Sequence, residues 1–371
     1  MNEFQLRSAR LGAVLSDPAS TLAMAMQILG VDGAYAAFEE GHPSIPEPMQ
    51  QRWRKLSPQW LLDRAGESQL RIVTPSDAEW PPQLNDLDAQ RPWALWVRGA
   101  SLNPVCEKRA VAIVGARSCT SYGERTASEF AAAIASQGHV VVSGGAYGID
   151  AAAHRGALVV EGRTIAVLAC GVDVAYPSAH AALFDRIASC GTVISEAVPG
   201  AHPTKSAFLV RNRLIAALAY GTVVVEARLR SGSISTYAQA RAMHRVLMAV
   251  PGPVDSPESA GAHALLQDDA LLVTSGVDVL RHVAVLGEIA PVTQKSVATE
   301  WDSLTIAERQ VHEAFPSRNS VTCDALLDRL TAPMTIGELL GALAALAQRG
   351  LVAEQLDGSW RRVRRLRGAE A

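Results

Sequence analysis

The chain has 371 residues, 49% of them apolar, which is enough for two or three domains with packed cores and excludes wholesale disorder. Its formal net charge of −3 excludes a protein that coats duplex DNA by bulk charge, so any nucleic-acid binding requires a local basic patch. No apolar run approaches the roughly 18 residues of a membrane helix, and the N-terminus lacks the order of a signal peptide, so we expect a cytoplasmic protein without a membrane partner.

Residues 1–65 are predicted to form a small helical domain. Ser20 predicts the N-cap of a helix that runs to about Leu29, and Gly30 then acts as a helix breaker. Three prolines between residues 43 and 48 predict a turn, and one further helix is expected over residues 49–62.

Residues 66–285 predict an extended α/β domain. Strands are expected at 71–73 and 93–97, and then at 111–114, 140–142, 164–168, 192–194, 222–226 and 246–250. Helices are expected between the later strands, at 122–137, 150–160, 179–189, 207–219 and 234–242. The near-continuous β-branched strands are typical of a parallel sheet buried on both faces. The alternation predicts an α/β fold with an extended Rossmann-like, doubly wound, mostly parallel sheet.

Residues 286–300 are predicted to be a linker, and residues 301–371 a separate domain. Helices are expected near 305–314, 321–329 and 335–348, the first opened by a capping box at Thr305. A ribbon follows and ends in a basic tail, which contains Arg361, Arg362, Arg364, Arg365 and Arg367. Three helices and a β-ribbon predict a winged-helix-like domain.

The first candidate binding feature is the turn after the strand at 111–114. Gly115 lets the chain turn tightly and lets a ligand approach the backbone, because it has no Cβ. Arg117 follows directly, where its planar guanidinium could hold a phosphate. The turn matches neither a Walker A motif nor a complete G-x-G-x-x-G motif. On this segment alone, a structural turn that carries a surface arginine is as good an interpretation as a phosphate site.

A second glycine loop follows the next strand of the same predicted sheet. It contains Ser143, Gly144 and Gly145, whose successive backbone N–H groups can form an anion-binding nest. Two loops at the carboxyl edge of one sheet make a concave site. For Asp150, capping of the next helix is favoured over catalysis, and His154 is expected on a helix face rather than as a catalytic base.

A third cluster of positive charge lies at a predicted helix start. Lys205, Arg211 and Arg213 fall within nine residues, so phosphate contact is one reading and a solvated basic face the other. Arg211 and Arg213 are two positions apart and diverge on a helix, which predicts that one faces a ligand and the other the fold.

No catalytic set is evident in the sequence. It contains no G-x-S-x-G elbow and no H-E-x-x-H, and its five cysteines are scattered without a C-x-x-C pair. We therefore expect no metal site, no cofactor and no catalytic residues.

Taken together, these segments resemble the DNA processing protein A family, also called DprA or Smf. The matching segments run in the family's order over about 110–265, and include IVGARSCTSYG, VVSGGAYGIDAAAHRGAL, FLVRNRLIAALA and VVVEARLRSGSISTYAQA. The order of small helical domain, extended Rossmann domain and winged-helix-like domain also resembles that family.

The resemblance implies a protein of natural transformation, not an enzyme. Such proteins bind and protect incoming single-stranded DNA, load RecA recombinase onto it and form homodimers through the Rossmann domain. Carried onto this chain, the DNA-binding pocket would use Gly115, Arg117, Ser143, Gly144, Gly145, Lys205, Arg211 and Arg213. Because only 5% of the residues are aromatic, phosphate capture is expected to outweigh base stacking, with Tyr147 and Tyr176 as the stacking candidates.

Two other classes of protein stay open on the sequence alone. A Rossmann-like enzyme that binds or hydrolyses nucleotides could have the same fold. A winged-helix transcription factor could use the C-terminal domain and the basic tail, but that reading leaves the large central domain unexplained.

Overall fold

The structure is a computed structural model that describes residues 1–371 except 68, 108, 285–303, 317–318, 331 and 364–371. It divides into two compact units, Met1–Ala290 and Pro291–Ala371, each of which is described by itself. The predicted linker at 286–300 lies outside the described residues, as do Arg364, Arg365 and Arg367 of the predicted basic tail.

The first unit is built on one sheet of nine strands, in the order β1-β2-β6-β5-β4-β3-β7-β8-β9. The strands are β1 (Arg71–Val73), β2 (Leu95–Gly99), β3 (Val111–Val114), β4 (Val141–Ser143), β5 (Thr164–Val167), β6 (Thr192–Ser195), β7 (Gly221–Val224), β8 (Val246–Ala249) and β9 (Leu271–Leu272). Neighbours from β6 through β9 are parallel, and β1 and β2 join at one edge by antiparallel pairing. The predicted mostly parallel α/β sheet is confirmed.

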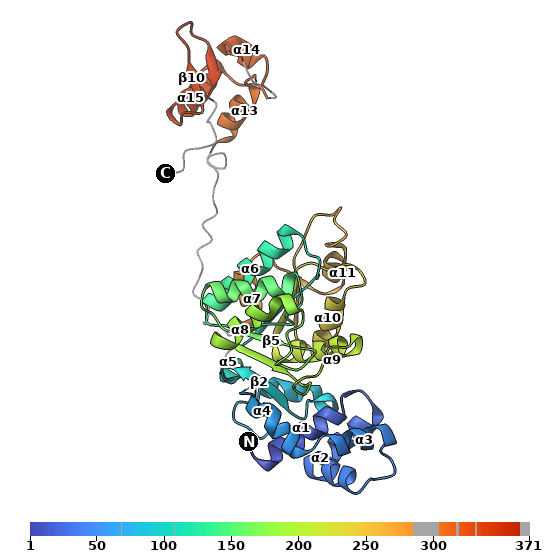
Figure 1. Cartoon of the computed structure of the whole chain (residues 1–371). Coiled ribbons are helices and arrows are strands. Elements are labelled where there is room, and N and C mark those ends of the chain that lie inside the picture. Colours follow the sequence, from blue (N-terminus) through green and yellow to red (C-terminus); the bar gives the residue numbers. More distant parts are fainter. Residues whose placement is uncertain (68, 108, 285–303, 317–318, 331, 364–371) are drawn as a thin grey trace. The chain divides into compact units, whose positions relative to one another are not determined.

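Helices cover both faces of this sheet because its strands alternate between two cores. Ala112 and Val114 of β3 belong to one buried cluster, and Val111 and Ile113 belong to the other. The first face carries the 3-10 helix η1 (Pro82–Gln90), α9 (Lys205–Leu218), α10 (Gly232–Ala242) and α11 (Ala260–Asp268). The second carries α6 (Ser121–Ser136), α7 (Ile149–Val159), α8 (Ala181–Cys190) and α12 (Gly276–Val283) (Figure 1). Two short elements, α5 (Asn103–Glu107) and η2 (Ser178–His180), complete the connections.

The winding of the chain reverses between β3 and β7, which are neighbours in the sheet although helices α6 to α9 separate them in sequence. Such a switch point leaves a crevice outside the carboxyl ends of the two strands, because their following loops diverge to opposite faces. The fold therefore places a candidate site at the ends of β3 and β7.

The N-terminal region consists of four helices, α1 (Glu3–Val14), α2 (Thr21–Glu39), α3 (Glu47–Lys55) and α4 (Pro58–Glu67), drawn in blue in Figure 1. The predicted N-cap is confirmed, because the Ser20 side chain accepts a hydrogen bond from the Ala23 N–H. Two boundaries differ from the prediction. Helix α2 kinks at Gly30 but resumes beyond it, and the helix predicted over 49–62 is two helices. Pro58 explains the second break, since proline disfavours a helical conformation in the residue before it.

By length and composition alone, helix α2 is long and apolar enough to cross a membrane, whereas the sequence analysis predicted no such helix. Its non-helical Gly30 interrupts the helix, and Ala23, Met26, Ala34 and Phe38 are buried in the core of the N-terminal helices. One face of this helix therefore serves the fold.

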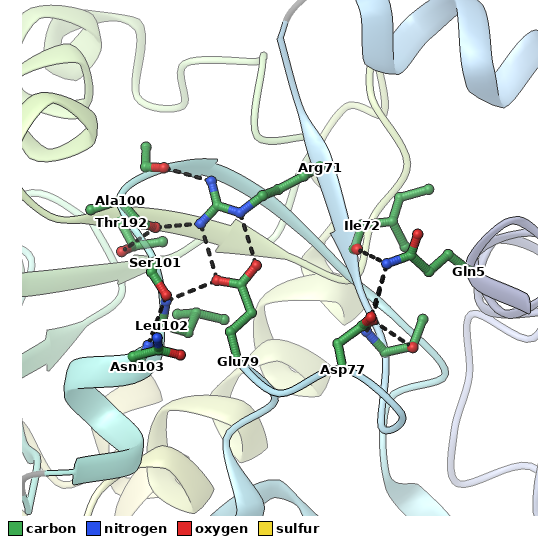
Figure 2. Close-up of polar contacts among 12 residues, drawn as sticks. Gln5, Arg71, Ile72, Asp77, Glu79, Ala100, Ser101, Leu102, Asn103 and Thr192 are labelled. Atoms are coloured by element: carbon green, nitrogen blue, oxygen red, sulfur yellow. Dashed lines mark hydrogen bonds and ion pairs between the residues drawn. The ribbon is translucent and has the colours of Figure 1, made fainter. Parts of the chain in front are cut away.

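Polar contacts attach the N-terminal helices to the sheet edge (Figure 2). The Gln5 side-chain amide of α1 donates to the Ile72 carbonyl of β1 at 3.1 Å and to Asp77 at 3.0 Å. Arg71 of β1 forms an ion pair with Glu79 and also donates to the carbonyl oxygens of Gly99, the last residue of β2, and Ala100. Although burial acts to raise it, the pKa of Glu79 is lowered, because Arg71 and a backbone N–H hydrogen-bond the charged form.

The second unit has its own core, formed by α13 (Ile306–Ala314), α14 (Cys323–Leu327), α15 (Ile336–Gln348) and the ribbon β10 (Val352–Glu354)–β11 (Trp360–Arg362). The predicted capping box at Thr305 is confirmed, with reciprocal hydrogen bonds between Thr305 and Glu308. The winged-helix assignment of this unit stays a prediction.

Candidate functional site

A groove of about 700 Å³ opens at the switch point. The loop after β3, the start of α9 and the loop between β7 and α10 form its walls. Of the residues proposed from the sequence, Gly115, Arg117, Lys205 and Arg211 line it. The topology thus brings together segments that are more than 100 positions apart in the chain (Figure 1).

Arg117 lies at the mouth of the groove with an exposed side chain. Its guanidinium carbon lies 4.7 Å from the centroid of the Phe208 ring, a cation–π contact that orients the charge without neutralising it. No carboxylate among the described residues lies within ion-pair distance of Arg117. The arginine is therefore available to an external anion.

Lys205 is the first residue of α9, a helix of 14 residues capped by Thr204. The side chain is exposed, and the first turn contains no acidic residue. A cation at a helix N-terminus is disfavoured by the helix dipole, whereas an anion bound there gains from both the dipole and the lysine. A negative ligand in the groove would therefore make this placement favourable.

Arg211 lines the groove but is mostly committed to the fold. Its side chain is 95% buried and donates to the carbonyl oxygens of Gly144, at 2.6 Å, and Val167. Burial lowers its pKa to about 10. A Cβ at position 144 would overlap the Arg211 guanidinium, so Gly144 makes room for a protein side chain.

Ser143 and Gly145 do not line the groove. The Ser143 hydroxyl is buried and donates to the Ile113 carbonyl at 2.7 Å, which joins β4 to β3. Gly145 has a positive φ of 70° and lies against the Phe184 ring, where a side chain would not fit. Ser143 and Gly145 thus support the site from beneath, whereas Ala146, which follows them, lines the groove.

Arg213 lies outside the groove, buried against Glu196. Its guanidinium donates to both carboxylate oxygens of that residue, at 2.7 and 2.8 Å. Arg211 and Arg213 therefore point in different directions, as expected from their spacing on a helix.

Two buried carboxylates lie at the groove: Asp150 is one of its lining residues, and Glu226 supports its loops from outside the lining. Asp150 accepts a hydrogen bond from the Ala146 N–H, and burial raises its pKa despite the nearby Arg211. Glu226, directly after β7, accepts hydrogen bonds from the Thr120 hydroxyl at 2.6 Å and the Thr120 N–H at 2.9 Å. Its backbone oxygen also accepts the Ala116 N–H at 2.7 Å, so Glu226 fixes the loop on both sides of Arg117.

The sequence reasoning missed Phe208 and Arg230 as residues of the groove. Phe208 follows Lys205 by three positions, the spacing that places two side chains on one helix face, so this signal was available. Arg228 and Arg230 form a local basic pair in the sequence, but only the course of the β7–α10 loop brings Arg230 to the groove.

A small pocket of about 50 Å³ adjoins the groove and has aromatic walls. Tyr147, Tyr176 and Phe208 line it together with Arg117. The rings of Tyr176 and Phe208 are 5.7 Å apart and tilted, and both tyrosines are about half exposed. These faces are of the kind on which an unpaired base can stack.

Comparison with known proteins identifies the same family over most of the chain. Residues 71–284 match the family model of DNA recombination-mediator protein A. A relative from Mycobacterium tuberculosis, named DNA processing protein DprA, is 45% identical over 314 residues, which span 82% of this chain and 79% of that protein.

Two solved structures have the same fold. DNA processing protein A from Streptococcus pneumoniae superposes with a TM-score of 0.66 at 31% identity, over 77% of this chain and all of that one. DNA processing protein A from Helicobacter pylori, whose structure is described in terms of its single-stranded DNA binding mode, superposes with a TM-score of 0.52 at 30% identity, over 58% of this chain and 96% of that one.

Proposed function

Because the chain belongs to the DNA recombination-mediator protein A family, we propose that it binds single-stranded DNA in the groove at the ends of β3 and β7. The observation that carries this proposal is the pair of exposed cations, Arg117 and Lys205, that line one groove without a carboxylate partner among the described residues. Phosphate is the matching anion, because a guanidinium can bind it through two hydrogen bonds and a helix N-terminus favours its charge.

The aromatic pocket beside Arg117 favours a single strand over a duplex. A base can stack on the Tyr147, Tyr176 or Phe208 ring only if it leaves its own stack, which costs less in a strand without a partner. The formal net charge of −3 makes the rest of the surface a poor substitute for this groove. We therefore propose local capture of a strand, with phosphate contacts supplying most of the affinity.

The test is the fluorescence anisotropy of a labelled oligothymidylate over a salt series, with a duplex of the same length alongside. Arg117→Ala and Lys205→Ala are each expected to weaken single-strand binding by about tenfold to a hundredfold, corresponding to roughly 1.5–3 kcal/mol for a charge-assisted hydrogen bond. Arg163→Ala is the matched control, because Arg163 is exposed and directly precedes β5, at the amino end of that strand, whereas the groove lies at the carboxyl ends of β3 and β7. Equal binding of the duplex, or no binding at all, would contradict the proposal.

We further propose the role that the family resemblance implies: a cytoplasmic protein that protects incoming single strands during natural transformation, loads RecA recombinase onto them and forms a homodimer through its sheet domain. The role is one of binding rather than catalysis. It predicts that the protein shortens the lag before RecA filaments form on DNA covered by single-strand binding protein. It also predicts that Arg117→Ala, which weakens DNA capture, lengthens that lag again. An unchanged lag with the wild-type protein would contradict the loading role while leaving strand binding intact.

A further inference from the structure

Besides the start of α9, the groove is lined by the loop from Arg228 to Gly232 between β7 and α10, which forms a second wall. Arg228, Arg230 and Ser231 of this loop line the same groove as Arg117 and Lys205. The sequence offers Ser231 of this wall and Ser233 directly after it as possible hydroxyl donors to a phosphate, but neither the sequence motifs nor the proposed function assigns Arg230 a ligand.

The beginning of the loop is held firmly in place. Arg228 forms an ion pair with Glu258 at 2.5 Å, and the Ala227 N–H donates to the Glu258 carbonyl at 2.7 Å. The chain at Gly261 packs so closely that a Cβ there would lie 2.5 Å from the Ala227 carbonyl oxygen. Arg228 is therefore already neutralised, and its role is to support the loop.

The end of the loop is tied to the first wall. The Asn212 side chain of α9 is 93% buried and donates to the Gly232 carbonyl at 3.2 Å. The two walls are thereby held at a fixed spacing, and any side chain between positions 228 and 232 is carried on a loop with two anchored ends. Such preorganisation lowers the entropic cost of capturing a ligand.

Arg230 lies between the two anchors with an exposed side chain. No ion pair or hydrogen-bond partner is found for it among the residues that the structure describes. This contrasts with Arg228, two positions earlier, which the Glu258 carboxylate holds. An unneutralised arginine on a fixed loop that lines the same groove as Arg117 has the properties of a second anion contact.

We infer that Arg230 binds a second phosphodiester of the strand whose first phosphate is held by Arg117 and Lys205. This inference rests on the proposed function, since it assumes that the groove holds single-stranded DNA. The strand then passes between two cationic walls, and at least two phosphate subsites operate in one groove.

The experiment measures oligothymidylate affinity against salt concentration for the full-length chain. Each phosphate contact on a single strand contributes about −0.7 to the slope of log K against log[salt]. Arg230→Ala is expected to make the slope shallower by about 0.7 and to weaken binding by about tenfold at low salt, whereas Arg230→Lys keeps the slope. If the two arginines bind different phosphates, the slope of log K against log[salt] for the double variant Arg117→Ala/Arg230→Ala is shallower than the wild-type slope by about 1.4.

The outcomes separate this inference from the proposed function. If the wild-type chain binds the strand and Arg117→Ala weakens it, but Arg230→Ala behaves like the Arg163→Ala control, the second subsite is overturned and the groove stands. If the double variant loses no more slope than Arg117→Ala alone, the two arginines share one phosphate and the inference also fails. If the wild-type chain binds no single strand, the proposed function itself fails. Thermal unfolding of each variant verifies that the loop change leaves the fold intact.

Discussion

His154 is a neutral imidazole enclosed in the core of the first unit. Its Nδ1 lies 2.7 Å from the Thr164 hydroxyl, which itself donates to the Val141 carbonyl. Because the Thr164 hydroxyl proton is engaged with the Val141 carbonyl, His154 Nδ1–H must be the donor to the hydroxyl oxygen. Nε2 is then the unprotonated nitrogen, and it has no hydrogen-bond partner among the described residues. Burial, with smaller electrostatic contributions from His180 and Arg211, lowers the pKa of His154 to about 3.

This environment makes His154 a source of pH-dependent stability. Its pKa in the folded chain is below the ordinary value of 6.5, so the unfolded chain binds more protons between these two values. The contribution of His154 to the free energy of unfolding is present above pH 6.5 and is lost as the pH falls toward 3. Between pH 7 and pH 5 the free energy of unfolding falls by about 2 kcal/mol for this reason. We predict that His154→Leu removes this part of the pH dependence of urea unfolding.

The control for that measurement is His42→Leu, which changes an exposed histidine. It is expected to leave the pH dependence of unfolding as in the wild type. A His154→Leu variant with the wild-type slope between pH 7 and pH 5 would show that another group is responsible.

Glu226 is the residue that most directly fixes the position of Arg117, although it does not line the groove. Its carboxylate accepts from both donors of Thr120, and its side chain fills the space beside Gly123, where a Cβ would not fit. In Glu226→Gln, one of the two Thr120 donors would face an amide N–H group. We predict that single-strand binding then weakens by about tenfold, equivalent to roughly 1.4 kcal/mol.

A double-mutant cycle distinguishes positioning from general destabilisation. If Glu226 acts through Arg117, the Glu226→Gln change should have little further effect on binding in an Arg117→Ala background. Additive losses of affinity would exclude this coupling. Glu129→Gln, an exposed carboxylate on α6, is the matched control.

The loop after β3 and the loop between β4 and α7 pack directly on each other beneath the groove. Gly148, the residue before α7, has a positive φ of 73°, and a Cβ there would overlap the Ala116 and Arg117 carbonyl oxygens. These loops cannot both keep their positions if a side chain is added at the contact. The close approach therefore transmits any change in the second loop to Arg117.

We predict that Gly148→Ala lowers both the free energy of unfolding and the affinity for a single strand. Gly138→Ala separates the two causes, because Gly138 also has a positive φ, of 80°, but a Cβ at this position would have no atom within 4 Å. Gly138→Ala is expected to lower the free energy of unfolding by about 1–2 kcal/mol through backbone strain alone, and to leave the affinity for a single strand unchanged. Chemical denaturation and anisotropy measure the two effects, and equal costs for both variants would refute the steric explanation.

The chain as a whole consists of two units with separate cores, and the proposed groove lies entirely in the first. We predict that a chain ending at residue 290 folds, and that it binds oligothymidylate within about threefold of full-length affinity, a difference of roughly 0.65 kcal/mol. Calorimetry should show the loss of one of two unfolding transitions. A collapse of affinity after this truncation would make the second unit the main DNA contact.

Local patterns in the sequence determined the α/β class, the positions of the main strands and helices, and the edge of the sheet where a site would form. Runs of β-branched residues such as 111–114 identify buried parallel strands, because only a sheet covered on both faces accommodates them. Because the strands at 111–114 and 140–142 are each followed by a glycine-containing loop, the sequence also indicated the carboxyl ends of the strands as the place for a candidate site. The break before Pro58 and the continuation of α2 beyond Gly30 were not predicted correctly, because packing of the N-terminal helices decides how a local breaker is accommodated.

Only the tertiary structure decided which of the candidate residues face the groove. Gly144 has the sequence context of a phosphate-binding glycine, yet its space is taken by Arg211, which is 67 positions away. Arg213 is as basic as Arg117 but is neutralised by Glu196, while Arg230 is left without a partner among the described residues. The reason is physical: a side chain's charge is available to a ligand only if no partner neutralises it, and its partners come from segments that meet only when the sheet forms.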